Sequence, residues 1–266
     1  MIKYIRDIAQ KENIEFVGIC DFDWVSSELL KCRAVGRLPK NSKSIILFLF
    51  PYYIDVKMGN VSRYAVVPDY HDVCYKKLSY FSDKFKERFQ NFNFSPFVDD
   101  SPIPEVKAAS KAGLGVVGDN GLLINKKYGS WVFIGEIVTD MLIEDDIHST
   151  LSTECIHCGK CVERCPSKAI GGQTFNKNVC LSYITQKKGA LSSQEIDLLR
   201  KGNLVWGCDT CQECCPLNSG DIETPLSEFH KNIQTVVNDT NYYKFNDRAY
   251  FWRPKNVIDR NNLLIN

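Results

Sequence analysis

The chain has 266 residues, of which 44% are hydrophobic and 12% aromatic, and its formal net charge is +1. This length and composition suit a packed core in one large domain or two modest ones. The charge excludes a strong sequence-independent attraction to nucleic acid, although it leaves room for a local basic face. No apolar run is long enough to span a bilayer and the first residues do not form a targeting segment, so we expect a soluble, cytoplasmic protein with no membrane partner.

The hydrophobic pattern predicts alternating helices and strands in the first half of the chain. The predicted helices span 2–12, 21–33, 70–90 and 104–112, and the predicted strands span 15–20, 44–50 and 131–139, with a further strand ending at 96–99. The segment 44–50 is almost wholly apolar, which predicts a strand buried on both faces. Strands separated by helices favour an α/β (or α+β) domain over residues 1–147.

The second half of the chain has a different character. A cysteine-rich module is expected from 148 to 220, with 191–199 as an inserted amphipathic helix. Residues 221–266 are polar and aromatic, and we expect them to form a tail with a short helix that wraps the body of the protein.

Twelve cysteines give the strongest chemical signal. Residues 155–166 read C-x2-C-x2-C-x3-C-P, the run with which bacterial ferredoxins hold [4Fe–4S] clusters. In such a run the fourth cysteine binds the other cluster of a pair, so a second cysteine group is required. Crosswise pairing predicts one cluster on Cys155, Cys158, Cys161 and Cys215, and a second on Cys165, Cys180, Cys208 and Cys211.

Zinc is the main alternative for these cysteines, because C-x2-C pairs also suit tetrahedral sites. Zinc sites usually come as two separated pairs, so three cysteines at successive x2 spacing, followed by C-P, favour iron–sulfur clusters. Disulfides are disfavoured, since clustered C-x2-C spacing without a signal peptide indicates metal binding. Cys214 adjoins Cys215, and we take Cys215 as the ligand because it precedes Pro216, which leaves Cys214 as a packed thiol.

An ordered series of motifs resembles the epoxyqueuosine reductases, a family of cobalamin-dependent tRNA-modification enzymes related to the reductive dehalogenases. Besides the cysteine run, the resembling pieces are Ser62-Arg63-Tyr64-Ala65, Asp69-Tyr70-His71, Val98-Asp99, Ala112-Gly113-Leu114-Gly115, Tyr128-Gly129-Ser130, Cys180-Leu181-Ser182-Tyr183-Ile184-Thr185 and Gly207-Cys208-Asp209-Thr210-Cys211. The resemblance covers most of the chain. It implies an oxidoreductase of queuosine biosynthesis that reduces an epoxide to an alkene, with a cobalamin between an α/β domain and a ferredoxin-like double [4Fe–4S] module.

The resemblance also implies roles for particular residues. Asp99 would be the proton donor, and a carboxylic acid with a raised pKa suits that role because the leaving epoxide oxygen must be protonated. The alternative for Asp99 is a strand-end aspartate that caps the next helix, with Asp100 or Ser101 as other caps. His71 is interpreted as a packed or hydrogen-bonded side chain rather than a cobalt ligand, and His157 as an exposed position of the cysteine turn. The residues that would contact the cobalamin are Ser62, Arg63, Tyr64, Leu123, Ile134 and Ser182.

Three departures from the family pattern bear on the substrate. Asp119 stands where the family has lysine, which reverses a charge beside the expected substrate pocket, and residues 100–102 differ from those that follow the donor in the family. The chain also ends near Arg260, about where the family has a helical-repeat segment that helps to bind tRNA. The substrate is therefore expected to be either tRNA or a smaller molecule.

The remaining expectations concern partners and the alternative function. We expect a ferredoxin or flavodoxin as the electron donor and a monomeric protein. The alternative function is an iron–sulfur electron-transfer or corrinoid-binding protein without substrate chemistry of its own, or a cluster protein that has lost cobalamin.

Overall fold

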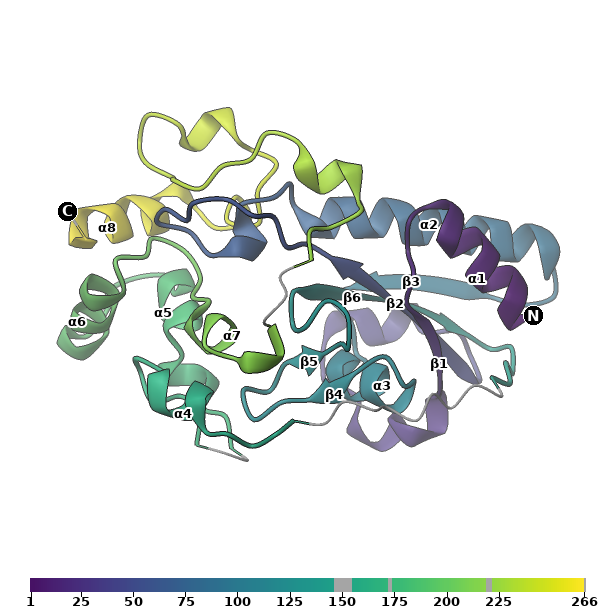
Figure 1. The fold of residues 1–266 in the computed structure, drawn as a ribbon. Coiled ribbons are helices and arrows are strands. Elements are labelled where there is room, and N and C mark those ends of the chain that lie inside the picture. The colour runs from purple at the N-terminus through teal and green to yellow at the C-terminus, as the bar shows by residue number, and fades with distance from the viewer. Residues whose placement is uncertain (146–154, 172–173, 219–221, 266) are drawn as a thin grey trace.

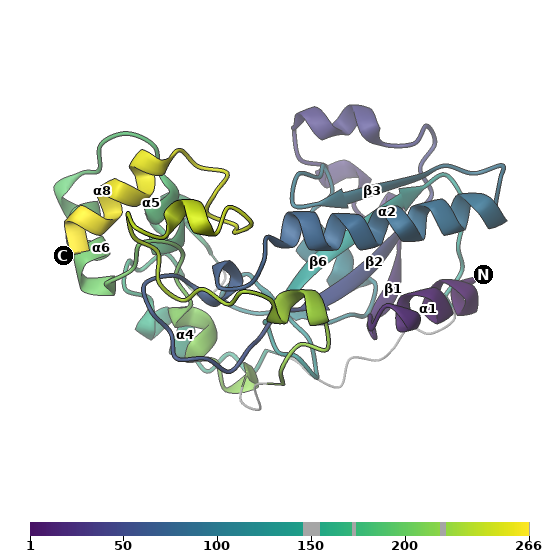
Figure 2. The same ribbon diagram turned by 90° about the horizontal axis from the view of Figure 1, so that it is seen from above.

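The structure is a computed structural model that describes residues 1–145, 155–171, 174–218 and 222–265 (Figure 1). The two termini lie at opposite ends of the molecule, the first beside the sheet and the last beside the helices of the cysteine module (Figures 1 and 2). Within the described residues, no helix combines the length and the hydrophobicity needed to cross a membrane.

A four-stranded antiparallel sheet organises the first half of the chain. Its strands follow the spatial order β1 (Val17–Asp21), β2 (Ser44–Pro51), β6 (Val132–Thr139) and β3 (Phe94–Val98). Every residue of β2 is buried, and its side chains alternate between two hydrophobic cores, as expected for a strand with both faces covered. The predicted mixed α/β fold and its doubly buried strand are confirmed.

Helices cover both faces of this sheet (Figures 1 and 2). On one face, α1 (Ile2–Lys11) and α2 (Tyr70–Arg88) contribute Ile5, Ile8, Leu78 and Phe81 to the first core. On the other face lie α3 (Glu105–Lys111) and the small hairpin of β4 (Val116–Val117) and β5 (Leu123–Ile124). The predicted helices at 2–12, 70–90 and 104–112 are therefore confirmed.

The prediction of a helix over 21–33 is wrong. The segment forms two short 3₁₀ turns, Phe22–Trp24 and Ser26–Glu28. The Asp21 side chain accepts the backbone N–H of Asp23 at 2.9 Å, which favours a tight turn over the start of a longer helix.

The cysteine module is built from short helices. These are α4 (Lys160–Arg164), α5 (Leu181–Gln186), α6 (Ser193–Gly202) and α7 (Thr210–Glu213), followed in the tail by α8 (Lys255–Ile265). The predicted inserted helix corresponds to α6, which starts with a capping box formed by Ser192 and Glu195. A third core joins Trp206 of the module to Tyr250 and Ile258 of the tail.

A buried polar network fixes the cysteine module to the sheet. Asn218 Oδ1 accepts the N–H of Ser130 at 2.7 Å, and Gln212 Nε2 donates to the Ser130 carbonyl at 3.0 Å. Gly129 has a φ of +57°, and a Cβ atom at this position would strike Asn218 Oδ1. Because Gln212 follows Cys211 in α7, the network sets the position of this cysteine relative to the start of β6.

Candidate active site

A cavity of about 430 Å³ lies between the sheet and the cysteine module, and we refer to it as the active-site cavity. Its apolar wall contains Tyr52, Phe133 and Tyr70, whose rings stack with centroid separations of 4.3 Å for Tyr52–Phe133 and 4.1 Å for Tyr70–Phe133. Asp99 and His71 also line it. The four cysteines on its wall are Cys165, Cys180, Cys208 and Cys211.

A second, smaller pocket contains the other cysteine group. It is lined by Cys155, Cys158, Cys161 and Cys215, together with the loop 118–120. Cys214 lines neither pocket, and its Sγ lies 3.7 Å from the Cys211 carbonyl oxygen. Each pocket therefore presents four thiols, the donor set that a [4Fe–4S] cluster requires.

An acid–base centre forms where α2 begins and β3 ends. The Asp69 side chain caps α2 by accepting the His71 N–H at 3.0 Å, and Asp69 Oδ1 also lies 2.7 Å from His71 Nδ1. The other ring nitrogen, Nε2, lies 3.2 Å from Asp99 Oδ2. The Tyr70 hydroxyl donates to the same oxygen at 3.0 Å. His71 thus bridges two carboxylates that are 30 residues apart in the chain.

The pKa values of His71 and Asp99 differ from those expected if Asp99 were an isolated carboxylic acid. Burial opposes the charge of the His71 ring, but hydrogen bonds to Asp69 and Asp99 outweigh it and raise the pKa of His71 to about 9. The hydrogen bond from His71 lowers the pKa of Asp99, and the Tyr70 hydroxyl acts in the same direction against burial. The expectation of a raised pKa at Asp99 is therefore wrong, because at neutral pH the proton rests on His71.

The loop that carries Asp99 has a specific conformation. Asp99 has a φ of +58°, in the left-handed region that aspartate and asparagine tolerate better than most residues. The alternative interpretation of Asp99 as a helix cap is wrong, since α3 has Pro104 at its N-cap and no capping side chain. Ser101 instead donates to Glu136, a buried carboxyl on β6, which ties the loop to the sheet.

Two exposed aromatic rings, Phe175 and Trp252, form the rim of the active-site cavity. Both line the cavity, and they are 51% and 57% exposed. The Arg253 guanidinium lies 3.6 Å from the centroid of the Trp252 ring, and the Lys177 ammonium lies 5.4 Å from that of Tyr183. Each of these two cations therefore lies against an aromatic ring.

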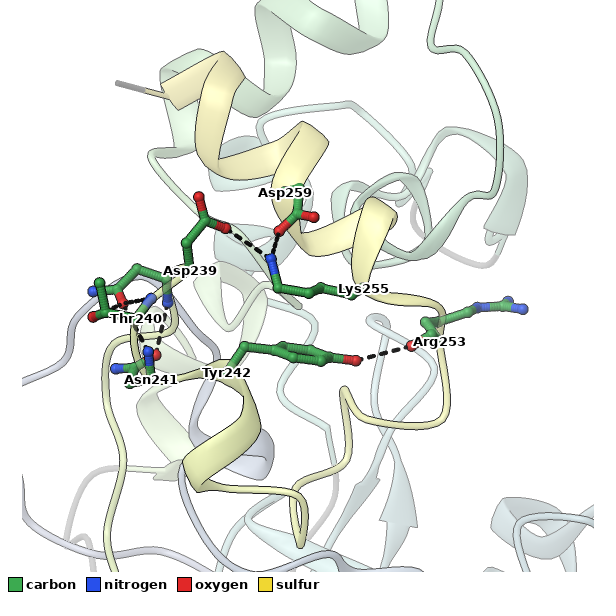
Figure 3. A network of polar contacts seen from close by, with 8 residues as sticks. Asp239, Thr240, Asn241, Tyr242, Arg253, Lys255 and Asp259 are labelled. Carbon is green, nitrogen blue, oxygen red and sulfur yellow. Dashed lines mark hydrogen bonds and ion pairs between the residues drawn. The ribbon is translucent and has the colours of Figure 1, made fainter.

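A polar network in the tail holds the Trp252–Arg253 part of the rim (Figure 3). The Tyr242 hydroxyl donates to the Arg253 carbonyl at 3.2 Å, and Lys255 Nζ lies 3.0 Å from Asp239 Oδ1 and also contacts Asp259. The side chain of Arg253 points away from this network. The network therefore fixes the backbone at Arg253 and does not include its guanidinium.

Comparisons with known proteins agree with this arrangement. Residues 154–218 match a family model described as a 4Fe-4S double cluster binding domain, and residues 34–100 match one described as epoxyqueuosine reductase QueG, DUF1730. The epoxyqueuosine reductase of Lactococcus garvieae is 35% identical, over 97% of this chain and 84% of the relative. The chain belongs to the epoxyqueuosine reductase family.

Solved structures of epoxyqueuosine reductases have the same fold. The Streptococcus thermophilus enzyme has a TM-score of 0.83 and 26% identity, covering 100% of this chain and 80% of that one. A structure with an epoxyqueuosine-modified tRNA-Tyr stem loop has a TM-score of 0.83 and 25% identity, over 99% and 80% of the two chains. A reductive dehalogenase shares the fold alone, with a TM-score of 0.53, 19% identity and 82% and 32% coverage.

Only some of the residues expected to contact the cobalamin line the active-site cavity. Tyr64 and Ser182 line the active-site cavity, whereas Leu123 and Ile134 line an adjoining cavity of about 120 Å³. Ser62 and Arg63 line neither of the two. Arg63 instead packs its guanidinium 4.6 Å from the Tyr53 ring centroid, and its backbone N–H donates to Asp209 at 2.7 Å.

Asp119 is also not where we expected it. The expectation that it lies beside the substrate pocket is wrong, because Asp119 lines the smaller cysteine pocket, where its Oδ1 lies 2.8 Å from His157 Nδ1. His157 is exposed, as predicted. The sequence interpretation missed Glu105 and Trp252, which carry no motif of their own.

Proposed function

We propose that this chain reduces the epoxide of epoxyqueuosine in tRNA to an alkene, with two [4Fe–4S] clusters and a cobalamin as cofactors. Family membership supports the reaction class. The observation that carries the proposal is the active-site cavity, which has Asp99 and His71 on its wall together with one complete group of four cysteines. Electrons and protons can therefore reach the same substrate.

The same geometry supports the two cysteine groups as cluster ligands. Cys165, Cys180, Cys208 and Cys211 would hold the cluster nearer the substrate, and Cys155, Cys158, Cys161 and Cys215 the other one. The second cluster lies in a separate pocket and is where a ferredoxin or flavodoxin would deliver electrons. We place the reaction, with a monomeric enzyme, in the cytoplasm.

The polar groups on the wall of the active-site cavity suit a cobalamin. Asp209 Oδ1 is buried on its wall and has no hydrogen-bond partner among the described residues, and burial raises the pKa of Asp209 to about 7. A ligand rich in amide N–H donors, as cobalamin is, suits such an acceptor. Tyr64 and Ser182 offer hydroxyl groups on the same wall. When bound, the clusters and the cobalamin supply the electrons of the reaction.

The chain's own residues supply the proton. His71 carries it at neutral pH, and Asp99, which lies against the ring at 3.2 Å, lines the cavity with it. The pair can pass a proton from His71 Nε2 through Asp99 to the epoxide oxygen as its bond to carbon breaks. Asp69 holds the ring and stabilises its charge, so the pair acts as one unit.

The rim supports a tRNA substrate. Single-stranded RNA is recognised by stacking of bases on aromatic side chains and by cationic groups along the backbone. Trp252 and Phe175 offer exposed rings, Arg253 offers a charge beside Trp252, and Lys177 offers one beside Tyr183. With a net charge of +1, binding would depend on this local surface and have a shallow salt dependence.

The test uses anaerobic, reconstituted protein with cobalamin, a chemical reductant and tRNA that carries epoxyqueuosine. Nucleoside analysis by mass spectrometry should show conversion to queuosine, with unmodified tRNA as the binding control. Conversion of the free nucleoside but not of the tRNA would favour a smaller substrate. No conversion by protein that holds both clusters and cobalamin would favour the electron-transfer function.

A further inference from the structure

Glu105 lies behind the acid–base centre, on the side away from the cysteines. It is the first residue of α3, and its partly buried side chain lines the adjoining cavity of about 120 Å³ together with Tyr70 and Asp99. Glu105 and Asp99 also both line an outer groove of about 450 Å³. Both carboxyl groups therefore reach the outer groove, and Glu105 joins this groove to the adjoining cavity.

The adjoining cavity is large enough to carry protons through water. A water molecule needs about 10–15 Å³ of such space and two to four polar partners. At about 120 Å³, the cavity has room for several, and Glu105, Asp99 and the Tyr70 hydroxyl provide the partners. A hydrogen-bonded chain between the two carboxyl groups is thus sterically possible.

The surroundings of Glu105 favour its neutral form. Burial raises the pKa of Glu105 to about 8, the negative charge of Asp99 adds to this, and His71 opposes it. The ionisable groups that interact with it from the packed elements are Asp99, Tyr70, His71 and Cys74, and Glu136 on β6. In the outer groove, Glu28 and Lys107 pair with each other.

The proposed reaction needs a second proton. Converting an epoxide to an alkene breaks both carbon–oxygen bonds, forms the carbon–carbon double bond and releases the oxygen as water, which consumes two electrons and two protons. The reduced clusters supply the electrons, and the His71–Asp99 pair holds one proton. The other must enter from elsewhere.

We propose that Glu105 supplies this second proton through water and Asp99, and is reprotonated from the outer groove. This inference rests on the proposed function. Glu105 does not touch the reacting atoms, so it is a supporting residue that acts through Asp99. It would restore the protonated centre in every turnover.

Glu105→Gln tests this role, because glutamine keeps the size of the side chain and cannot supply the proton. In the native enzyme, kcat should fall as the pH rises through about 8. In Glu105→Gln that limb should disappear, leaving one near 9 from His71, and kcat at pH 7 should fall at least ~10-fold. Small weak acids such as imidazolium should partly restore kcat in the variant but not accelerate the native enzyme.

Infrared difference spectroscopy gives a readout that needs no substrate or cofactor turnover. At pH 7 the native protein should show a component of the protonated-carboxyl carbonyl stretch that titrates near pH 8, and this component should be missing from Glu105→Gln. Glu28→Gln, in the same outer groove, is the matched control and should change neither the spectrum nor the pH profile.

The outcomes separate this inference from the proposed function. If the native enzyme converts epoxyqueuosine in tRNA but Glu105→Gln keeps the native kcat and pH profile, the role of Glu105 is refuted and the function stands. A Glu105 carboxyl already ionised at pH 6 would also refute it. If the native enzyme converts nothing, the proposed function fails, and the infrared titration still decides whether Glu105 holds a proton.

Discussion

Asp99→Asn tests the paired acid–base centre directly, because it removes one carboxylate and changes little else. Asparagine tolerates the left-handed backbone at this position, where φ is +58°, so the loop should keep its shape. Its side-chain oxygen can still accept the Tyr70 hydroxyl, which donates at 3.0 Å in the native chain. Loss of the proton path should lower kcat by ~10²–10⁴.

The same substitution should change His71 by a predictable amount. Two carboxylates raise the pKa of His71 from 6.5 to about 9 against burial, and Asp69, the nearer one at 2.7 Å, remains in the variant. The midpoint of His71 should therefore fall below 9. Since the folded-state pKa is the higher one, the ion pairs stabilise the fold fully below pH 6.5, and this stability is lost as the pH rises through 9.

The loss of stability should be small. The His71 and Asp99 side chains are 36% and 59% exposed, so solvent screens their pair and Asp99→Asn should cost at most about 1 kcal/mol below pH 6.5. Proton NMR of the imidazole gives the midpoint, urea unfolding gives the stability, and turnover of modified tRNA gives kcat. Asp100→Asn is the control, since Asp100 lies outside this hydrogen-bonded centre. Native turnover in Asp99→Asn, or an unchanged His71 midpoint, would refute the reasoning.

Three further substitutions test other parts of the molecule. Cys215→Ala should lower bound iron from about eight to about four atoms per chain, whereas Cys214→Ala should leave the iron content unchanged. The reverse result in iron analysis would make Cys214 the cluster ligand and Cys215 the packed thiol. Trp252→Ala should weaken binding of the tRNA stem loop about 5- to 150-fold in a fluorescence titration, because the contact with one stacked base is lost. Unchanged affinity would exclude the rim as the tRNA-binding surface. Gly129→Ala should destabilise the protein in urea by more than the about 1–2 kcal/mol that its positive φ costs, because the methyl group strikes a buried side chain. Gly121→Ala, with a φ of +76° and open space around it, should show the backbone cost alone.

Local patterns predicted most of the sheet domain because its elements are strongly amphipathic or wholly apolar. The stripe of Ile5 and Ile8 identified α1, and the apolar run 44–50 identified β2. The prediction of a helix over 21–33 failed because the apolar residues of this segment do not form a continuous stripe. Its buried core residue, Val25, lies between the two 3₁₀ turns. Local turn chemistry outweighed the weak helical pattern there.

The site was harder to predict because its residues meet only through tertiary contacts. The D-Y-H motif placed Asp69 and His71 together, but nothing in the spacing indicated that Asp99 would lie against the same ring. For Asp119, the sequence pattern predicted an effect at the substrate that the structure does not support. Its charge was visible in the sequence, yet its effect depends on which pocket it lines, and the fold places it at the cysteines rather than at the substrate.

The relative pKa values of the three groups indicate a separate role in proton transfer for each, which the D-Y-H motif alone does not. His71 holds a proton up to a pKa of about 9 and Glu105 up to about 8, whereas the pKa of Asp99, between them, is lowered. A group whose pKa lies below those of both neighbours holds a proton only briefly, and in its protonated form it is a stronger acid than either neighbour. Asp99 is then best understood as the exchange point, which takes a proton from either neighbour and releases it at once to a stronger base. The developing alkoxide of an opening epoxide is such a base, so a lowered pKa at Asp99 is compatible with proton delivery.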